Sequence, residues 1–458
     1  MQGWKSTIKS TVYGVQTGWK IGRWNVRSAP QNPIGFALLW AQGRQGIQWL
    51  RGVFSGSVVF LGLSIGATVA LLHGVNFFQP LEWQGYRLLF SARNALSASN
   101  TLSAESRLPL FPPNLPPNQW DDRLALIAID DQSLKSYGQF ATWKRDRYTE
   151  LLNLLQNSPP AAIGFAMLFP EETPEDPPLA EAMLVNGTIV LGLAQDSQGN
   201  TLLPWPFLDS SAGLGHVQSV SDPDGITRST WLYLPTEDSA IPSLGVALAQ
   251  VYNETLQSLG SQASQASIPI PPPQPSLEGN QVWINWPAPA QQLPQYSLAA
   301  VLKHQVHPDT FANKIVLVGI TATGLESNPL RTPFYGDAKG SGVYLYAATL
   351  DNLLNDRFLR RPAGLWVSLG LVVLGGISAL GLHRLALHWQ LVTVVFFPLF
   401  WFSAALLGFY AQWWFPLAAP ILTLWLTGIA LQARSYNDRQ LLMDLFSKHV
   451  STWLTDKS

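Results

Sequence analysis

The chain has 458 residues, of which 47% are hydrophobic and only 12% are charged, and its formal net charge is −1. So small a charged fraction is unusual for a purely soluble chain, and it indicates a membrane protein with room for more than one structural unit. Cysteine is absent. Its absence excludes a disulfide framework, thiolate catalysis and a cysteine metal site.

Residues 1–52 contain seven basic residues, five tryptophans and no acidic residue. This composition suits a cytoplasmic segment that lies on an anionic inner leaflet, although a disordered tail fits equally well. Nucleic-acid binding is a weaker third reading, and we expect no nucleic-acid partner. The apolar run that follows is too long for the core of a cleavable signal peptide.

Residues 53–78 form the first predicted transmembrane helix, because no charge interrupts them before Gln79 and Pro80. Glycines at small-xxx-small spacing precede and run through this segment: Gly52, Gly56, Gly62 and Gly66. Such spacing lets a second helix approach closely. We expect a homodimer, but glycine is common in membrane helices in any case, so dimerisation through this face is the less favoured interpretation.

Residues 79–364 predict an α/β domain, a mixed sheet with flanking helices. Apolar strand-like runs occur at 124–130, 161–169, 188–194, 229–234, 282–286 and 314–321. Helical patterns occur at 145–156, 178–184, 244–252, 297–306 and 343–354. This alternation is typical of helices packed on a sheet. Proline-rich loops are expected at 108–117 and 267–276.

Three further apolar segments, 365–382, 391–410 and 415–431, predict three more transmembrane helices. Four spans place both termini in the cytoplasm and the acidic segment 79–364 outside, in a multi-pass protein of the plasma (inner) membrane. Arg357, Arg360 and Arg361 stand just before the second span and oppose this orientation. Residues 432–458 then form a cytoplasmic linker with helical spacing.

Candidate ligand-binding residues follow two of the predicted strands. Asp130 and Asp131 end the first strand, where α/β sheets commonly place function, although one of them is more simply explained as a helix N-cap. Thr321 and Thr323 follow the last strand, where their loop offers donors to a small anion or forms a plain turn.

A third candidate group lies in the sequence DPDGITR, which contains Asp222, Asp224 and Arg228. Its Pro-Asp-Gly sequence is a strong turn signal, and a turn is favoured over a calcium loop because the full ligand pattern is missing. His304 and His307 are three residues apart without an identifiable third ligand, so a solvated helix end is the better interpretation. We expect no metal site, no cofactor and no catalytic constellation.

The order of several short sequences resembles the type-2 CHASE sensors, extracytoplasmic domains of bacterial, especially cyanobacterial, signalling receptors. These sequences are AIDDQSL, IGFAMLF, GLGHV, DPDGITR, IPSLGVALA, INWPAP, IVLVGITATGLES, GVYLYAATLDNLL and RFLRRP. The resemblance covers residues 81–362 and continues through the three following spans. It implies a cytoplasmic output such as an adenylate or guanylate cyclase or a kinase, and the segment 442–451 resembles the linker before a cyclase domain.

The chain departs from the family pattern at three positions. Ala166 replaces an aspartate, Tyr346 replaces a histidine, and Thr452 stands where proline commonly follows the linker. These differences put any ligand contact of the family at the first two positions in doubt. No cyclase or kinase sequence follows residue 451, so we do not expect this chain to be an enzyme.

The sequence thus predicts a membrane-bound sensor of a small-molecule or ionic signal outside the cytoplasm. It would relay that signal through the three C-terminal spans to a cytoplasmic output such as a cyclase or kinase, and a cyclase or kinase in trans is a candidate partner. Two alternatives remain open. One is a truncated adaptor or dimerisation partner of a full-length receptor, and the other is a membrane-anchored extracytoplasmic enzyme.

Overall fold

A computed structural model describes residues 56–100, 119–169, 171–195, 201–202, 205–219, 221–236, 239–258, 267–325, 330–334 and 340–455. The predicted N-terminal segment 1–52 and the predicted proline-rich loop 108–117 lie outside these residues. Residues 61–458 form one compact unit, to which the following description applies. The second proline-rich loop, 267–276, has no helix or strand, as expected.

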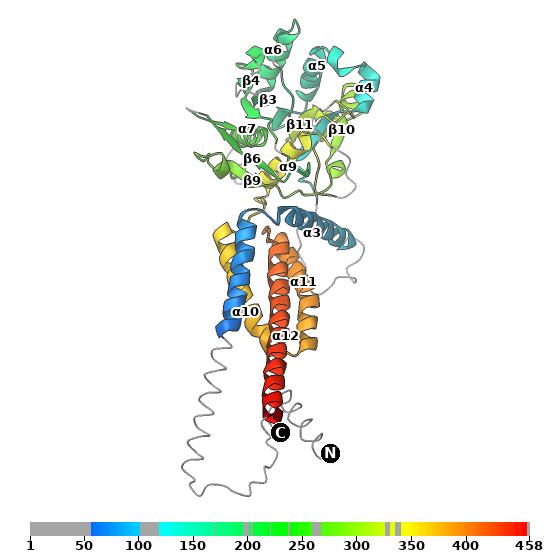
Figure 1. Ribbon diagram of the computed structural model, residues 1–458. Helices are drawn as coiled ribbons and strands as arrows, with labels where there is room; N and C mark the ends of the chain where they lie inside the picture. The colour runs from blue at the N-terminus through cyan, green and yellow to red at the C-terminus, as the bar shows by residue number, and fades with distance from the viewer. Residues whose placement is uncertain are drawn as a thin grey trace. The chain divides into compact units, whose positions relative to one another are not determined.

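A seven-stranded sheet forms the centre of the α/β domain (Figure 1). Its strands are β1 Leu124–Ile129, β2 Ala162–Phe165, β3 Ile189–Gln195, β4 Thr201–Leu202, β5 Gly213–His216, β10 Gln295–Ser297 and β11 Ile315–Ile320. The strand order is β10-β1-β11-β2-β3-β4, and β5 also pairs with β3. All pairs are parallel except β3 with β4, so the sheet is mixed as predicted.

Helices cover both faces of this sheet because its central strands are apolar on both sides. Every residue of β1 is buried, and successive side chains enter opposite cores. One core contains α7 Leu244–Ser258 and α9 Val343–Leu354. The other contains α5 Asp146–Leu155, α6 Asp176–Asn186 and α8 Leu298–Leu302. Short elements complete the domain, namely α4 Asp131–Tyr137, β6 Ser229–Trp231, β7 Tyr233–Pro235, β8 Ala240–Pro242 and β9 Gln281–Trp283.

The helical half contains three helices that are long and apolar enough to cross a membrane. They are Gly56–Gly74, α10 Gly364–Arg384 and α11 Leu387–Tyr410. The predicted spans 53–78, 365–382 and 391–410 correspond to these three. The predicted fourth span, 415–431, is not among them, because α12 starts at Ala418 and turns polar from Gln432 onward. This helix, Ala418–Thr455, also includes the helical pattern predicted for the linker.

Two glycines of the first span allow a close helix contact within the chain. A methyl group built on Gly62 would lie 2.2 Å from the backbone oxygen of Gly375 in α10, and one on Gly66 would lie 2.5 Å from that of Leu371. Backbone atoms cannot move aside as a flexible side chain can, so these positions require glycine. The predicted small-residue face is therefore filled by α10 of the same chain.

Adding one methyl group at this contact should separate the two helices. We expect Gly62→Ala to destabilise the protein by about 1–3 kcal/mol through overpacking, measured as a lower thermal unfolding midpoint in detergent. Gly370→Ala is the matched control, because nothing lies within 4 Å of a methyl group at this position of α10. Equal midpoints for the two variants would show that the glycine contact is not a close one.

Candidate functional site

Helix α3, Gln79–Asn100, contacts both the α/β domain and the membrane-type helices α11 and α12 (Figure 1). It starts directly after Phe78, where Asn76 has a left-handed backbone conformation with φ of 60° that ends the preceding helix. Tyr86, Leu89 and Phe90 on one face are fully buried. Their spacing of three and four residues is helical, and this signal would have predicted α3, which the sequence analysis missed.

Glu82 of α3 caps the N-terminus of α12. Its carboxylate accepts hydrogen bonds from the backbone N–H groups of Leu417 at 2.6 Å, Ala418 at 3.0 Å and Ala419 at 3.2 Å. The next residue, Pro420, has no N–H group. All four N–H positions that lack a partner at a helix start are thereby accounted for. The negative charge also faces the positive end of the α12 dipole.

Burial opposes the charge on Glu82. It raises the pKa of this carboxyl group above its usual value, although the three N–H donors and the charge of Arg361 act in the other direction. The side chain is 7% exposed. Glu82 therefore connects α3 to α12 through a carboxylate whose protonation state is sensitive to its surroundings.

Arg361 lies between two tryptophans at the start of α10. Its guanidinium carbon is 4.5 Å from the ring centroid of Trp283, in β9, and 4.5 Å from that of Trp414, just before α12. Next to it, the backbone of Arg360 pairs with Gln412 and Trp414. The arginines that opposed the predicted topology thus have structural partners, because Arg357 forms an ion pair with the buried Asp351.

The predicted turn at DPDGITR brings Asp222, Asp224 and Arg228 together. The fully buried Arg228 donates to Asp222 at 2.6 Å and to both oxygens of Asp224 at 2.8 and 2.6 Å. The turn itself is confirmed by the Gly225 N–H, which donates to the Asp222 carbonyl at 2.7 Å. Burial alone would raise the pKa of Asp224, but the hydrogen bonds and charge of Arg228 lower it overall.

Arg228 also connects this turn to α3. Its guanidinium carbon is 5.1 Å from the ring centroid of Trp83 and 5.3 Å from that of Tyr86. Tyr86 in turn packs on Trp414, with ring centroids 4.6 Å apart. A chain of contacts therefore runs from residues 222–228 through Tyr86 of α3 to Trp414, just before α12.

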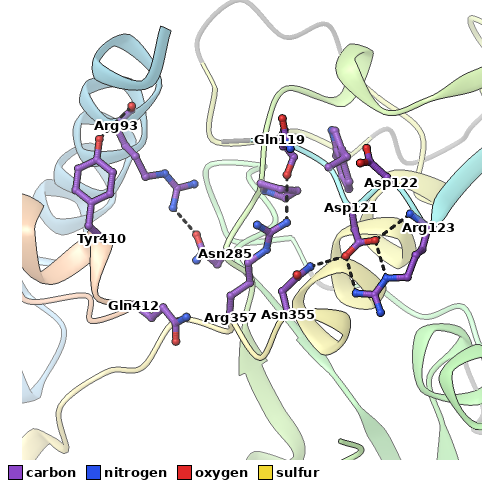
Figure 2. Close-up of a pocket in the computed structure, with 12 residues that line it drawn as sticks. Arg93, Gln119, Asp121, Asp122, Arg123, Asn285, Asn355, Arg357, Tyr410 and Gln412 are labelled. Atoms are coloured by element: carbon purple, nitrogen blue, oxygen red, sulfur yellow. Dashed lines mark hydrogen bonds and ion pairs between the residues drawn. The ribbon is translucent and has the colours of Figure 1, made fainter. Parts of the chain in front are cut away.

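A pocket of about 520 Å³, lined mostly by polar residues, lies where α3 meets the α/β domain and the end of α11 (Figure 2). We call this meeting of α3 with the α/β domain, α11 and the start of α12 the junction. The walls of the pocket come from α3, from loops of the α/β domain and from the end of α11. The lining residues are Arg93, Gln119, Trp120, Asp121, Asp122, Arg123, Asn285, Pro287, Asn355, Arg357, Tyr410 and Gln412. This volume falls within the range that is typical of small-molecule sites.

Two of the three pocket arginines are neutralised by carboxylates. Arg123 forms two hydrogen bonds with Asp121, at 2.9 and 2.7 Å. Arg357 donates from Nε to Asp351 at 2.6 Å and from Nη2 to the Gln119 carbonyl at 3.2 Å. The charges of these two arginines therefore already have partners in the protein.

Arg93 is different, because among the described residues its guanidinium donates hydrogen bonds only to uncharged oxygen atoms. It donates to the amide oxygen of Asn285 and to the carbonyl of Trp286, both at 2.5 Å (Figure 2 shows the former). Its Nε–H has no hydrogen-bond partner in the described part of the chain. Burial lowers the pKa of Arg93 to about 10.

Aromatic rings offset part of this charge. The Arg93 guanidinium lies 4.5 Å from the ring centroid of Phe90 and 5.2 Å from that of Phe409. Such contacts contribute about 0.5–2 kcal/mol each, whereas the burial of one ion costs several kcal/mol. Arg93 is thus the pocket cation with the least compensation.

The other predicted site residues lie at the ends of β1 and β11. Asp130 caps α4, accepting from the Ser133 N–H at 2.8 Å and from the Ser297 hydroxyl at 2.7 Å, which confirms the N-cap interpretation. Thr323 donates from its N–H to Asp131 at 2.9 Å. The backbone of Thr321 donates to the Ile129 carbonyl. Thr323 and Asp131 are brought together, but they satisfy each other.

The two histidines form no metal site. Both His304 and His307 are exposed after α8, as expected for a solvated helix end. Among the described residues, no group of three His, Cys, Asp or Glu side chains could hold a metal ion. The sequence reasoning missed Glu82 and Arg93 because it treated the residues after the first span as part of the α/β domain.

The fold and the junction define a membrane-type protein in which an α/β domain contacts the spans through an additional helix. A family model for the CHASE2 domain matches residues 60–383, which is most of the chain. The chain therefore belongs to the CHASE2 family of sensory domains, as the sequence resemblance predicted. No curated protein and no solved structure matches the chain.

Replacing the carboxyl group of Glu82 should change how stability depends on pH. Because the pKa of Glu82 is raised in the folded state, the folded protein binds its proton more tightly than the unfolded chain does. The stability of the wild type relative to Glu82→Gln should therefore increase as pH falls through the raised pKa toward 4.5, the ordinary value. Thermal unfolding between pH 7 and 4.5 measures this difference.

The control for this experiment is Glu254→Gln, because Glu254 is an exposed glutamate on α7. The pH dependence of Glu82→Gln is judged against that of this exposed Glu→Gln replacement. A constant difference between the wild type and Glu82→Gln would contradict a raised pKa at the helix cap.

Proposed function

We propose that this protein is a membrane-bound signal-transduction sensor whose α/β domain, outside the cytoplasm, controls the position of α12. Membership of the CHASE2 family supports the sensory role. The single structural observation that carries the relay is the cap that Glu82 of α3 makes on the first turn of α12. Through this cap, a shift of α3 would act directly on the helix that continues to Thr455.

The relay begins at the turn that contains Asp222 and Asp224. These two carboxylates hold Arg228, and Arg228 packs on Trp83 and Tyr86 of α3. A signal that alters the turn would therefore move α3 and, through Glu82, the start of α12. For such a signal to act, it must bind two arrangements of these contacts with different affinity.

The first part of α12 supplies the fourth span in this proposal. It is apolar from Ala418 to Leu431 and packs against both α10 and α11, two of the candidate spans. With four spans, the segment 79–364 lies outside the cytoplasm, and both termini lie in it. The protein would then lie in the plasma (inner) membrane, with residues 432–455 of α12 in the cytoplasm.

In this proposal the signal passes along α12 to a cytoplasmic output partner such as a cyclase or kinase domain. The helical segment of α12 beyond Leu431 is the contact surface for such a partner. A homodimer would use a face other than the one at Gly62 and Gly66, because α10 fills that face within one chain.

Introduced cysteines test the proposed topology, since the natural chain has none. Gln139 is exposed in the α/β domain, and Asn437 is exposed on α12. We expect Gln139→Cys to react with a membrane-impermeant maleimide in intact cells, or in cells with a permeabilised outer membrane. Asn437→Cys should react only after the inner membrane is opened.

The cysteine-free parent measures background labelling in this experiment. If both cysteines react in intact cells, α12 does not cross the bilayer and the fourth span is wrong. If neither reacts before lysis, the α/β domain is cytoplasmic, and the proposed detection of an external signal is wrong as well.

The relay predicts that a change in the turn reaches α12. We expect the double variant Asp222→Asn, Asp224→Asn to accelerate hydrogen exchange of the Leu417–Ala419 amides about fivefold, equivalent to about 1 kcal/mol in local opening. The reason is that Arg228 would lose both charged partners and its hold on α3. Mass spectrometry of peptides from the start of α12 measures the rate.

Asp131→Asn serves as the control for the relay, because Asp131 bonds Thr323 at the end of the sheet rather than α3. It should leave exchange at Leu417–Ala419 unchanged. Equal exchange rates in the wild type and the double variant would show that the turn and α12 are not coupled.

A further inference from the structure

A buried cation, Arg93, lines the pocket in Figure 2. Arg93 is 7% exposed, and it forms no ion pair among the residues that the structure describes. Its Nε–H is buried and without a partner. An unpaired buried donor needs an explanation, and Arg93 lines a cavity that a ligand can enter.

The neighbouring carboxylates make their direct contacts with other arginines. Asp121 is engaged by Arg123, and the buried Asp351 is engaged by Arg357. Asp122 is exposed, and Figure 2 shows it apart from Arg93, on the side of the lining where Arg123 lies. An anion that enters the pocket would therefore find Arg93 uncompensated.

We propose that this pocket binds a phosphate group, with Arg93 as the principal charged contact. Planar guanidinium groups bind phosphate oxygens through paired, charge-assisted hydrogen bonds. The amide side chains of Gln119 and Gln412 line the same cavity and can donate to further oxygens. The cavity of about 520 Å³ has room for a phosphate together with an organic substituent.

The phosphate can come from two sources. A soluble phosphate compound would reach the pocket from the aqueous side, past the exposed Gln119 and Asp122. A phospholipid headgroup would reach it from the bilayer, because Tyr410 ends the candidate span α11 and lines the pocket together with Gln412. In both cases the group that Arg93 would bind is a phosphate.

Phosphate binding would act on the relay directly. Arg93 belongs to α3, whereas its present acceptors, Asn285 and Trp286, belong to the α/β domain. A phosphate that competes with these acceptors would alter the contact between α3 and that domain. The inference rests on the proposed sensory function for this consequence, but binding itself can be tested without it.

The test uses the full chain in an uncharged detergent and measures the thermal unfolding midpoint against inorganic phosphate at constant ionic strength. A second titration uses short-chain phosphatidylglycerol in the same micelles. We expect saturable stabilisation of the wild type in at least one titration. The apparent affinity should fall at least about tenfold in Arg93→Gln, because the charged partner is lost.

A second variant keeps the test valid if Arg93→Gln does not fold. Gln119→Glu places a negative charge on an exposed lining position, and we expect it to weaken binding about fivefold through repulsion. Gln139→Glu is the matched control, because Gln139 is also exposed but does not line the pocket. Its affinity should equal that of the wild type.

Saturation with phosphate alone supports a soluble ligand, and saturation with phosphatidylglycerol alone supports a lipid headgroup. Stabilisation that is equal in the wild type and Gln119→Glu overturns the proposal, since such an effect does not arise in this pocket. The absence of saturable stabilisation in both titrations also overturns it. Neither negative result affects the topology or the exchange rates at α12, so the proposed sensory function would stand.

Discussion

The rest of the structure depends on how one carboxylate is placed. Glu82 lies in the first turn of α3 and accepts hydrogen bonds from the otherwise unpaired N–H groups at the start of α12, a helix more than three hundred residues later in the chain. A buried carboxylate is costly unless several donors surround it. The close fit of α3 to α12 is therefore a condition for keeping this charge buried, and it determines where the neighbouring aromatic residues lie.

Two arginines next to the membrane helices are engaged by contacts within the protein. Arg361 lies between two tryptophans, and Arg357 is bound to Asp351. In the proposed topology, these contacts would explain why a cluster of positive charge can stand beside a span without setting its orientation. Positive-inside reasoning assumes that flanking charges are free to interact with lipid. At this junction, the charges of Arg361 and Arg357 are engaged by aromatic packing and by an ion pair instead.

Sequence patterns predicted the local elements well because their apolar periods are strong. The continuous apolar run at β11 and the helical spacing at α9 both correspond to observed elements. Glycine spacing in the first span identified a close contact, but no local pattern could show that its partner is α10 of the same chain. The junction was missed for the same reason, since Glu82 and Leu417 meet only through tertiary packing. The turn at Asp222 was predicted, whereas its contact with α3 was not.

The length of α12 has a mechanical consequence. Its 38 residues form one uninterrupted helix, which at the helical rise is about 57 Å long. A tilt of only about 5° at the end held by Glu82 would displace the far end by about 5 Å, the pitch of one helical turn. The helix thus acts as a lever, in which a change too small to disturb the packing of the α/β domain becomes a large displacement near Thr455.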